Sequence, residues 1–384
     1  MPAGGDSNGS AGPATTAFAA PGAGAASEAG HAPARSQAMP ANGGSPAALE
    51  RAGSWAQRRT YRHRDFSAEQ IASIRATRGL GVSVCLPARE CAATIAAAVG
   101  RLRELQGAGL IDQVAVVDAA SADGTGELAE RAGAEVYQEA ALMSEFGPVL
   151  GKGDAMWRAL SVLRGDLICF LDADTEDLSP RFVTGLLGPL VCERGVSFVK
   201  AFYRRPLSEG SAAAAEAEGG RVNTLTARPA LALFYPELAH VRQPLAGEVA
   251  ARRELLHAIP FACGYGVEVA MLIDAWRELG LDGLAQVDLE EHHHRHQPLS
   301  ALAPMALTVL ATVARRLERD GTLRDGGGDG DGGGDGGAAA HALDVDARAP
   351  VERPPLSGVA RPAADRARER GLARDAGARR QDEP

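Results

Sequence analysis

Short, nearly continuous apolar runs alternate with helical segments along the middle of the chain, and this alternation constrains the fold most. The runs lie at 82–87, 113–119 and 166–174 and are rich in apolar, often β-branched, residues. Such runs are typical of strands that are buried on both faces of a parallel sheet. Between the first two, residues 92–105 have apolar side chains at helical spacing. The pattern therefore predicts an α/β fold with a mostly parallel central sheet flanked by helices.

Composition separates this region from two tails. Residues 1–60 are dominated by Ala, Gly, Pro and Ser, and residues 321–384 contain a Gly/Asp tract followed by an Arg- and Asp-rich segment. Neither tail has enough large apolar side chains to offset the entropy of ordering, so we expect both to be disordered. A single domain is then predicted at 61–320. No stretch of the sequence is apolar enough to span a bilayer.

Charge and cysteine content narrow the classes of function. The formal net charge is −9 and the pI is near 5.6, which argues against a nucleic-acid binder. The five cysteines are odd in number and lack metal-site spacing, so a reducing cytoplasm is the expected location. An anionic ligand would therefore have to be bound by a local group of basic residues.

Asp172 and Asp174 directly follow the third apolar run. Side chains at i and i+2 of an extended chain share a face, so the two carboxylates can converge on one cation. Asp is also a common turn residue, and the pair could simply close the strand. Pro87 and Asp118 likewise follow predicted strands, and ligands of open α/β sheets bind at such strand ends.

Several basic residues lie where an anion could bind. Lys152 stands between two glycines at the start of a predicted helix, where backbone amides and the helix dipole favour an anion. Arg204 and Arg205 follow a further strand, and Arg221 and Arg228 come after a pair of glycines. Arginine suits phosphate or carboxylate because of its planar fork. Each of these residues could equally be a solvated surface charge.

Two more polar features belong to the pattern. Glu268 lies in the first turn of an amphipathic helix, where it could bind a ligand or only complement the helix dipole. Four histidines, including His294, follow an apolar strand and could bind a metal or lie in solvent. Carboxylates, a histidine and nearby basic residues together suit a nucleotide-sugar transferase, in which Mg²⁺ or Mn²⁺ bridges the diphosphate.

Long motifs then identify a family. They include "LPARE", "GKGDAMWRAL", "FLDAD", "GGRVNTLTARP", "QPLAGEVAARREL" and "GLAQVDLEEHHHRHQPL". They resemble the actinobacterial glucosyl-3-phosphoglycerate synthases, retaining glycosyltransferases with the GT-A (nucleotide-diphospho-sugar transferase) fold, over about residues 80–315. The resemblance implies transfer of glucose from UDP-glucose to 3-phosphoglycerate, as the first step of methylglucose lipopolysaccharide synthesis. It also implies a homodimer and a Mg²⁺ or Mn²⁺ cofactor, with 80–200 mainly binding the nucleotide sugar and 201–320 serving acceptor binding and dimerisation.

The same resemblance implies roles for individual residues. Those expected to bind the donor are Pro87, Ala88, Arg89, Glu90, Ala120, Lys152, Asp172, Ala173 and Glu268, and Lys152, Asp172 and Glu268 are also the candidate catalytic residues. Those expected to bind the metal are Asp174 and His294, and those expected to bind the acceptor are Arg205, Gly220, Arg221 and Asn223.

The chain departs from the family pattern with Glu90 in place of Asn, Cys91 in place of Glu and Asn223 in place of Thr, and the loop after the second strand, "DAASADGT", loses a Ser. Two alternatives stay open. One is a related transferase that uses another donor, such as GDP-mannose, or another small anionic acceptor. The other is a binding protein that has kept the fold and lost turnover.

Overall fold

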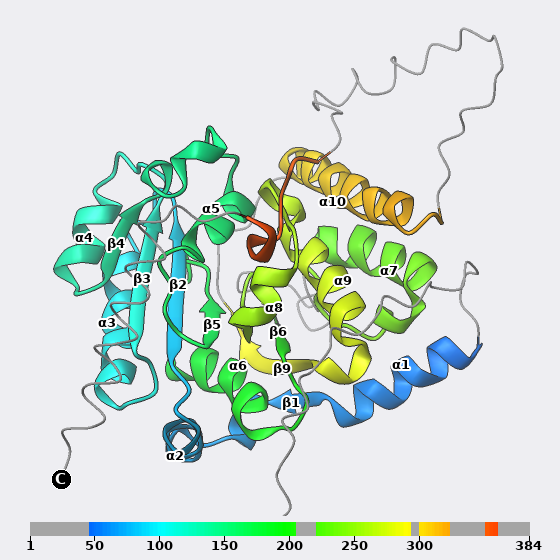
Figure 1. Ribbon diagram of the computed structural model, residues 1–384, viewed down its shortest axis with the longest axis horizontal. Coiled ribbons are helices and arrows are strands. Elements are labelled where there is room, and N and C mark those ends of the chain that lie inside the picture. The colour runs from blue at the N-terminus through cyan, green and yellow to red at the C-terminus, as the bar shows by residue number, and fades with distance from the viewer. Residues whose placement is uncertain (1–45, 205–219, 293–298, 323–349, 360–384) are drawn as a thin grey trace, which may run out of the picture. The chain divides into compact units, whose positions relative to one another are not determined.

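The computed structural model describes residues 46–204, 220–292, 299–322 and 350–359 (Figure 1). These residues belong to a single compact unit, and within them lies an eight-stranded sheet with the order β1-β9-β6-β7-β5-β2-β3-β4. The strands from β5 to β4 in this order are β2 (Val82–Ala88), β3 (Gln113–Asp118), β4 (Glu135–Gln138) and β5 (Leu167–Phe170). Those of the other half are β1 (Thr60–Arg62), β6 (Phe198–Arg204), β7 (Val249–Arg252) and β9 (Leu284–Glu291).

The sheet is mostly parallel, as the sequence predicts. Only β7 among these eight strands runs antiparallel to its neighbours, β5 and β6. The other neighbouring pairs are parallel, so the carboxyl ends of seven strands meet at one edge. Cys85 pairs with Phe170 on one side and with Ala115 on the other, which places Asp172 and Asp118 near the same edge.

Helices cover both faces of the sheet, and each face has its own hydrophobic core. Cys85 packs into one core and its neighbour Leu86 into the other, which is why the strand is continuously apolar. Helices on the face of Cys85 are α1 (Pro46–Arg58), α5 (Lys152–Ala159), α7 (Arg228–Phe234), α8 (Arg253–Ala258), α9 (Val267–Leu279) and α10 (Leu299–Arg319). Those on the face of Leu86 are α2 (Ala68–Arg78), α3 (Ile95–Gly107), α4 (Thr125–Arg131) and α6 (Pro180–Cys192).

The N-terminal boundary of the fold corrects the prediction of a disordered tail at 1–60. Helix α1 begins at Pro46 and buries Trp55, which is 1% exposed. The indole Nε1 of Trp55 donates a hydrogen bond of 2.9 Å to the carbonyl oxygen of Leu284 in β9. Trp55 buries a large side chain with its polar group satisfied, and Ala48 and Ala52 on the same helix are buried beside it, so the helix docks although the tail as a whole is poor in large apolar residues.

The C-terminal boundary differs from the prediction in the same way. Within the tail expected at 321–384, β10 (Glu352–Arg353) pairs antiparallel with β8 (Phe261–Ala262). Leu356 follows in a 3-10 turn and is 6% exposed in the core. The predicted tail therefore contains a segment that packs on the domain. None of the helices in the described ranges is both long and apolar enough to cross a membrane.

Candidate functional site

Lys152, Asp172 and Glu268 meet at the carboxyl edge of the sheet. Lys152 is the first residue of α5, Asp172 lies two residues beyond β5, and Glu268 lies in the first turn of α9. The ammonium Nζ of Lys152 donates to Asp172 Oδ1 at 2.6 Å and to Glu268 Oε1 at 2.9 Å. The structure thus brings together three residues whose individual sequence patterns were ambiguous.

The charge state of Lys152 follows from these contacts. Burial acts to lower the pKa of its ammonium, because desolvation disfavours the charged form. The negative charges of Asp172 and then of Glu268 outweigh burial, and the pKa lies well above its ordinary value. Lys152 is therefore a fixed positive charge at neutral pH, with 28% of its side chain exposed to solvent.

Gly247 leaves the room that Asp172 needs. A Cβ atom at position 247 would lie 2.1 Å from Asp172 Oδ2, and it would lie 2.3 Å from Oδ1. The peptide around Asp172 is also tied down, since Thr175 Oγ1 donates to the Asp172 carbonyl at 2.9 Å and Thr94 Oγ1 to the Ala173 carbonyl at 2.7 Å. Sequence reasoning gave no role to Gly247, although it lies in a stretch that resembles the family.

Asp174 has a charge environment that suits a cation. Burial raises the pKa of its carboxyl, and the negative charge of Asp172 raises it further, while Lys152 lowers it. A cation beside Asp174 would relieve both effects, and carboxylate oxygens are ligands that Mg²⁺ and Mn²⁺ prefer. The other predicted ligand, His294, lies outside the described residues. Among the residues that the structure does describe, no group of three or more His, Cys, Asp or Glu could hold a metal.

His292, the first of the four histidines that the sequence offers as possible metal ligands, contacts the loop after β5. Its ring stacks on Tyr203 with centroids 4.6 Å apart, and its Nε2 lies 3.1 Å from Thr175 Oγ1 and 3.5 Å from Glu248 Oε1. His292 is 2% exposed. Through Thr175 it therefore helps to hold the loop after β5 in place. The first histidine of the run is thus a buried residue of the fold.

The loops after β2 and β3, which hold the predicted nucleotide-contacting residues, are joined to each other. The Glu90 amide donates to Ser121 Oγ at 2.9 Å, and Glu90 Oε1 accepts from the Ala122 amide at 2.9 Å. Glu90 and Ala120 have φ values of 54° and 55°, in the left-handed region. Asn, the family's residue at position 90, adopts this region readily. Glu90 keeps the turn by bonding to the neighbouring loop.

The other predicted donor residues lie at the same end of the sheet. Pro87 and Ala88 end β2, and the Ala88 carbonyl accepts from the Ala119 amide at 2.9 Å. Arg89 and Ala120 are exposed there. Cys91, at the family's Glu position, is 8% exposed, and its amide donates to Thr125 Oγ1 at 2.8 Å.

The predicted acceptor residues lie on the segment before α7. Gly220 and the exposed Arg221 precede a π-helical turn at Asn223–Ala227. Asn223 is 4% exposed, its Nδ2 donates to the Arg242 carbonyl at 3.3 Å, and its Oδ1 accepts from the Leu245 amide at 3.2 Å. Both polar atoms of this side-chain amide thus bind the backbone of the 242–245 segment, so in this structure Asn223 fixes that segment to the π-helical turn. Arg205 lies outside the described residues.

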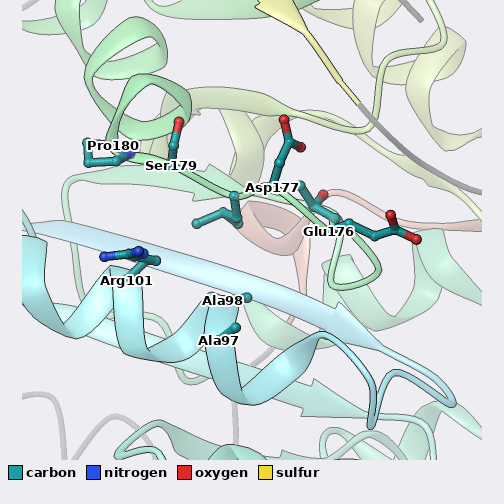
Figure 2. A pocket seen from close by; sticks show the side chains of 9 residues that line it. Ala97, Ala98, Arg101, Glu176, Asp177, Ser179 and Pro180 are labelled. Atoms are coloured by element: carbon teal, nitrogen blue, oxygen red, sulfur yellow. The ribbon is translucent and has the colours of Figure 1, made fainter. Parts of the chain in front are cut away.

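A cavity of about 510 Å³ lies beside this centre, on the far side of the loop after β5. Figure 2 shows Ala97, Ala98 and Arg101 of α3 on one side of it and the loop from Glu176 to Pro180 on the other. Lys152, Asp172 and Glu268 do not line it. The cavity is therefore separate from the predicted donor residues, although Thr175 borders both.

Comparison with known proteins agrees with this geometry. Residues 83–228 match the sequence profile of Glycosyl transferase family 2. The chain is 48% identical to the glucosyl-3-phosphoglycerate synthase of Mycolicibacterium smegmatis over 238 residues, which are 62% of this chain and 78% of that relative.

Two solved structures are similar to the whole domain. The mannosyl-3-phosphoglycerate synthase of Rubrobacter xylanophilus matches with a TM-score of 0.72 and 43% identity, over 80% of this chain and 100% of that one. The glucosyl-3-phosphoglycerate synthase of Mycobacterium tuberculosis, solved in complex with Mn²⁺, UDP-glucose and phosphoglyceric acid, matches with a TM-score of 0.62 and 38% identity. That match covers 76% of this chain and 95% of the other, so the similarity extends through both halves of the sheet.

Proposed function

The chain belongs to the glucosyl-3-phosphoglycerate synthase family, and from this premise we propose that it transfers glucose from UDP-glucose to 3-phosphoglycerate. The observation that carries the proposal is the ammonium of Lys152 held between two carboxylates at the strand ends. A sugar diphosphate is complementary to this arrangement, because its phosphate oxygens pair with an ammonium and its hydroxyls donate to carboxylates.

In the proposed mechanism, each residue acts on one part of the substrates. Lys152 pairs with the diphosphate and stabilises the negative charge that develops on departing UDP. Glu268, 11% exposed, accepts hydrogen bonds from glucose hydroxyls and fixes the orientation of the ring. Arg221 binds the phosphate or the carboxylate of 3-phosphoglycerate through its planar fork.

A divalent ion is part of the proposal. Asp174 and His294 are the ligands that we propose, and Mn²⁺ is present with UDP-glucose in the related structure from M. tuberculosis. When bound, such an ion neutralises the diphosphate and makes it a better leaving group. We propose that the acceptor hydroxyl attacks on the face that the diphosphate leaves, so that the anomeric configuration is retained.

The setting of the reaction is also proposed. The product would enter methylglucose lipopolysaccharide synthesis, as the family resemblance implies, and the enzyme would act as a homodimer. Cytoplasmic location is supported by five free cysteines, two of which, Cys85 and Cys169, are completely buried.

The second candidate function is transfer of mannose from GDP-mannose to 3-phosphoglycerate. The similarity to the mannosyl-3-phosphoglycerate synthase of R. xylanophilus, at 43% identity, favours keeping this candidate. Glucose and mannose differ only in the configuration of one hydroxyl, so the two candidates differ mainly at the base, where UDP carries uracil and GDP carries the larger guanine.

One experiment separates the candidates. The full chain is incubated with Mn²⁺, 3-phosphoglycerate and either UDP-glucose or GDP-mannose, and release of UDP or GDP is measured. We expect UDP-glucose to support turnover at least tenfold faster, with an α-anomeric proton in the NMR spectrum of the product. Faster release of GDP would replace the first candidate by the second, and a β-anomer would refute retention.

A further inference from the structure

Residues 350–359, here called the C-terminal strap, pack beside the start of α5. Figure 1 shows the strap, in orange-red, running beside α8 and α5. Besides the β10–β8 pairing, the Cys263 amide donates to the Val351 carbonyl at 2.8 Å, and Trp157 Nε1 of α5 donates to the Pro354 carbonyl at 2.8 Å. The strap is thus fixed to the same helix whose first residue is Lys152.

Arg353 is the strap residue whose side chain binds both α5 and the loop that precedes it. It is 7% exposed and binds the carboxylate of Asp154 through two hydrogen bonds, Nε to Oδ1 at 2.8 Å and Nη2 to Oδ2 at 2.6 Å. Its Nη1 donates to the Phe146 carbonyl at 2.7 Å, and its Nη2 donates to the Pro148 carbonyl at 2.9 Å. A single guanidinium therefore joins a side chain of α5 to the loop that precedes this helix.

Asp154 carries the connection further. It is 0% exposed, and its Oδ2 also accepts from the Leu150 amide at 2.9 Å. Its Oδ1 accepts from Nε of Arg158, which is equally buried. The guanidinium of Arg158 donates to four carbonyls of the same loop, those of Leu142, Met143, Gly147 and Pro148.

The loop at 142–151 is thus held by two buried arginines that share one carboxylate. It contains only a short 3-10 turn at Ser144–Phe146, so its own backbone bonds hold it weakly. Its last residue, Gly151, has a φ of 84° and precedes Lys152 directly. The position of the Lys152 backbone therefore depends on how this loop is fixed.

We propose that Arg353 is a positioning residue for Lys152, and that binding of the nucleotide diphosphate depends on the C-terminal strap through Asp154 and the 142–151 loop. This inference rests on the proposed function, because it takes Lys152 to be the residue that pairs with the diphosphate. Arg353 does not touch the substrate, and it acts by keeping the start of α5 in place.

Lysine cannot replace Arg353 in this role. The guanidinium is a planar fork that makes four bonds here, whereas an ammonium is a point charge on a flexible stem. Arg353→Lys keeps the charge beside Asp154 and removes the fork. Glu352→Gln is the matched control, because Glu352 belongs to the same strand but pairs with Arg316 and Arg315 of α10.

The test uses the full-length chain and two independent measurements. Amide hydrogen exchange of the peptide covering 142–151 reports on the loop without any substrate, and calorimetry with UDP and Mn²⁺ reports on the diphosphate site. In Arg353→Lys we expect exchange of the Leu150 amide to be about tenfold faster and UDP to bind about tenfold more weakly. The Michaelis constant for 3-phosphoglycerate should stay within twofold of wild type, as should all values in Glu352→Gln.

The outcomes distinguish positioning from a general loss of stability. Unchanged exchange, or faster exchange with unchanged UDP binding, would overturn the proposal. Equally weak UDP binding in Glu352→Gln would also overturn it, because loosening the strap would then weaken UDP binding without any change in the contacts of Arg353 to the loop. If Arg353→Lys does not fold, Arg353→Gln, which removes the fork and leaves Asp154 paired with Arg158, carries the same test.

Failure of the proposed function would look different. In that case the wild-type chain would not bind UDP or turn over UDP-glucose at all. The exchange measurement would still decide whether Arg353 holds the loop, and equal exchange in the variant and the wild type would overturn that part.

Discussion

Replacing Gly247 by alanine tests whether the position of the Asp172 carboxylate matters for catalysis. The added Cβ would lie 2.1 to 2.4 Å from Oδ2, Oδ1 and Cγ of Asp172. Carbon–oxygen contacts of this kind need roughly 3.3 Å, so the carboxylate must move by roughly 1 Å. The movement requires only a rotation of a short side chain that is 24% exposed, and the fold should tolerate it.

We expect Gly247→Ala to lower activity strongly and to change stability little. Asp172 Oδ1 accepts a 2.6 Å hydrogen bond from Lys152, so a displaced carboxylate also releases the ammonium from its position. A misplacement of about 1 Å costs on the order of 10²-fold in rate, equivalent to about 2.7 kcal/mol of activation free energy. We expect kcat/KM to fall by about this factor, with the free energy of unfolding changed by less than about 1 kcal/mol.

The assay is steady-state release of UDP from UDP-glucose in the presence of 3-phosphoglycerate, with thermal melting in parallel. Gly100→Ala is the matched control, because Gly100 lies inside α3 and an added Cβ there meets no atom within 4 Å. That variant should keep wild-type activity and gain about 0.5–1 kcal/mol of stability from better helix propensity.

A double-mutant cycle identifies the route of the effect. If Gly247→Ala acts through Asp172, it should cause little further loss in an Asp172→Ala background. The reasoning is refuted if folded Gly247→Ala protein stays within threefold of the wild-type rate. It is equally refuted if the substitution costs a further hundredfold in the Asp172→Ala background.

Three further predictions follow from the site and its surroundings. Asp174→Ala should melt like the wild type but lose nearly all Mn²⁺-dependent turnover, and wild-type activity would exclude Asp174 as a ligand. Arg221→Lys should raise the Michaelis constant for 3-phosphoglycerate about ten- to a hundredfold, whereas weaker UDP-glucose binding in calorimetry would place Arg221 at the donor instead. Burial, and then the charge of Asp154, raises the pKa of Glu139 to about 7, so its ionisation destabilises the fold progressively as pH rises from about 4.5 to 7. The free energy of unfolding of Glu139→Gln should therefore exceed that of the wild type by about 1–3 kcal/mol at pH 8 and equal it at pH 4. A difference between the two proteins that is the same at both pH values would contradict this.

The fold could be predicted because its determinants are local. Strands buried on both faces must be apolar at every position, and Cys85 and Leu86 pack into opposite cores as that pattern requires. The end of β5 could be read for the same reason, since Asp172 follows the apolar run at once. That Lys152 would contact both Asp172 and Glu268 could not be read from the sequence, because these two contacts join residues 20 and 116 positions apart.

The N- and C-terminal boundaries of the domain could not be predicted, because they depend on single residues, and the average composition of a segment does not reveal these. Trp55 docks α1, and Arg353 reaches Asp154 across 199 positions. A fragment limited to residues 60–320, which the composition suggests as a complete domain, lacks both side chains. It would expose the Trp55 site on β9 and leave Asp154 with a single buried arginine. Removing one partner from a buried ion network is costly, so we expect this fragment to be less stable than the full chain.

The groups that gather at the site explain why a divalent ion suits it. Three carboxyl groups, those of Asp172, Asp174 and Glu268, lie around the ammonium of Lys152, which already pairs with two of them. A divalent cation at Asp174 would add positive charge beside Lys152, and the diphosphate could then pair with both. Burial, and then the negative charge of Asp172, raises the pKa of the Asp174 carboxyl, so a cation beside this carboxyl would oppose both effects and favour its ionised, metal-binding form.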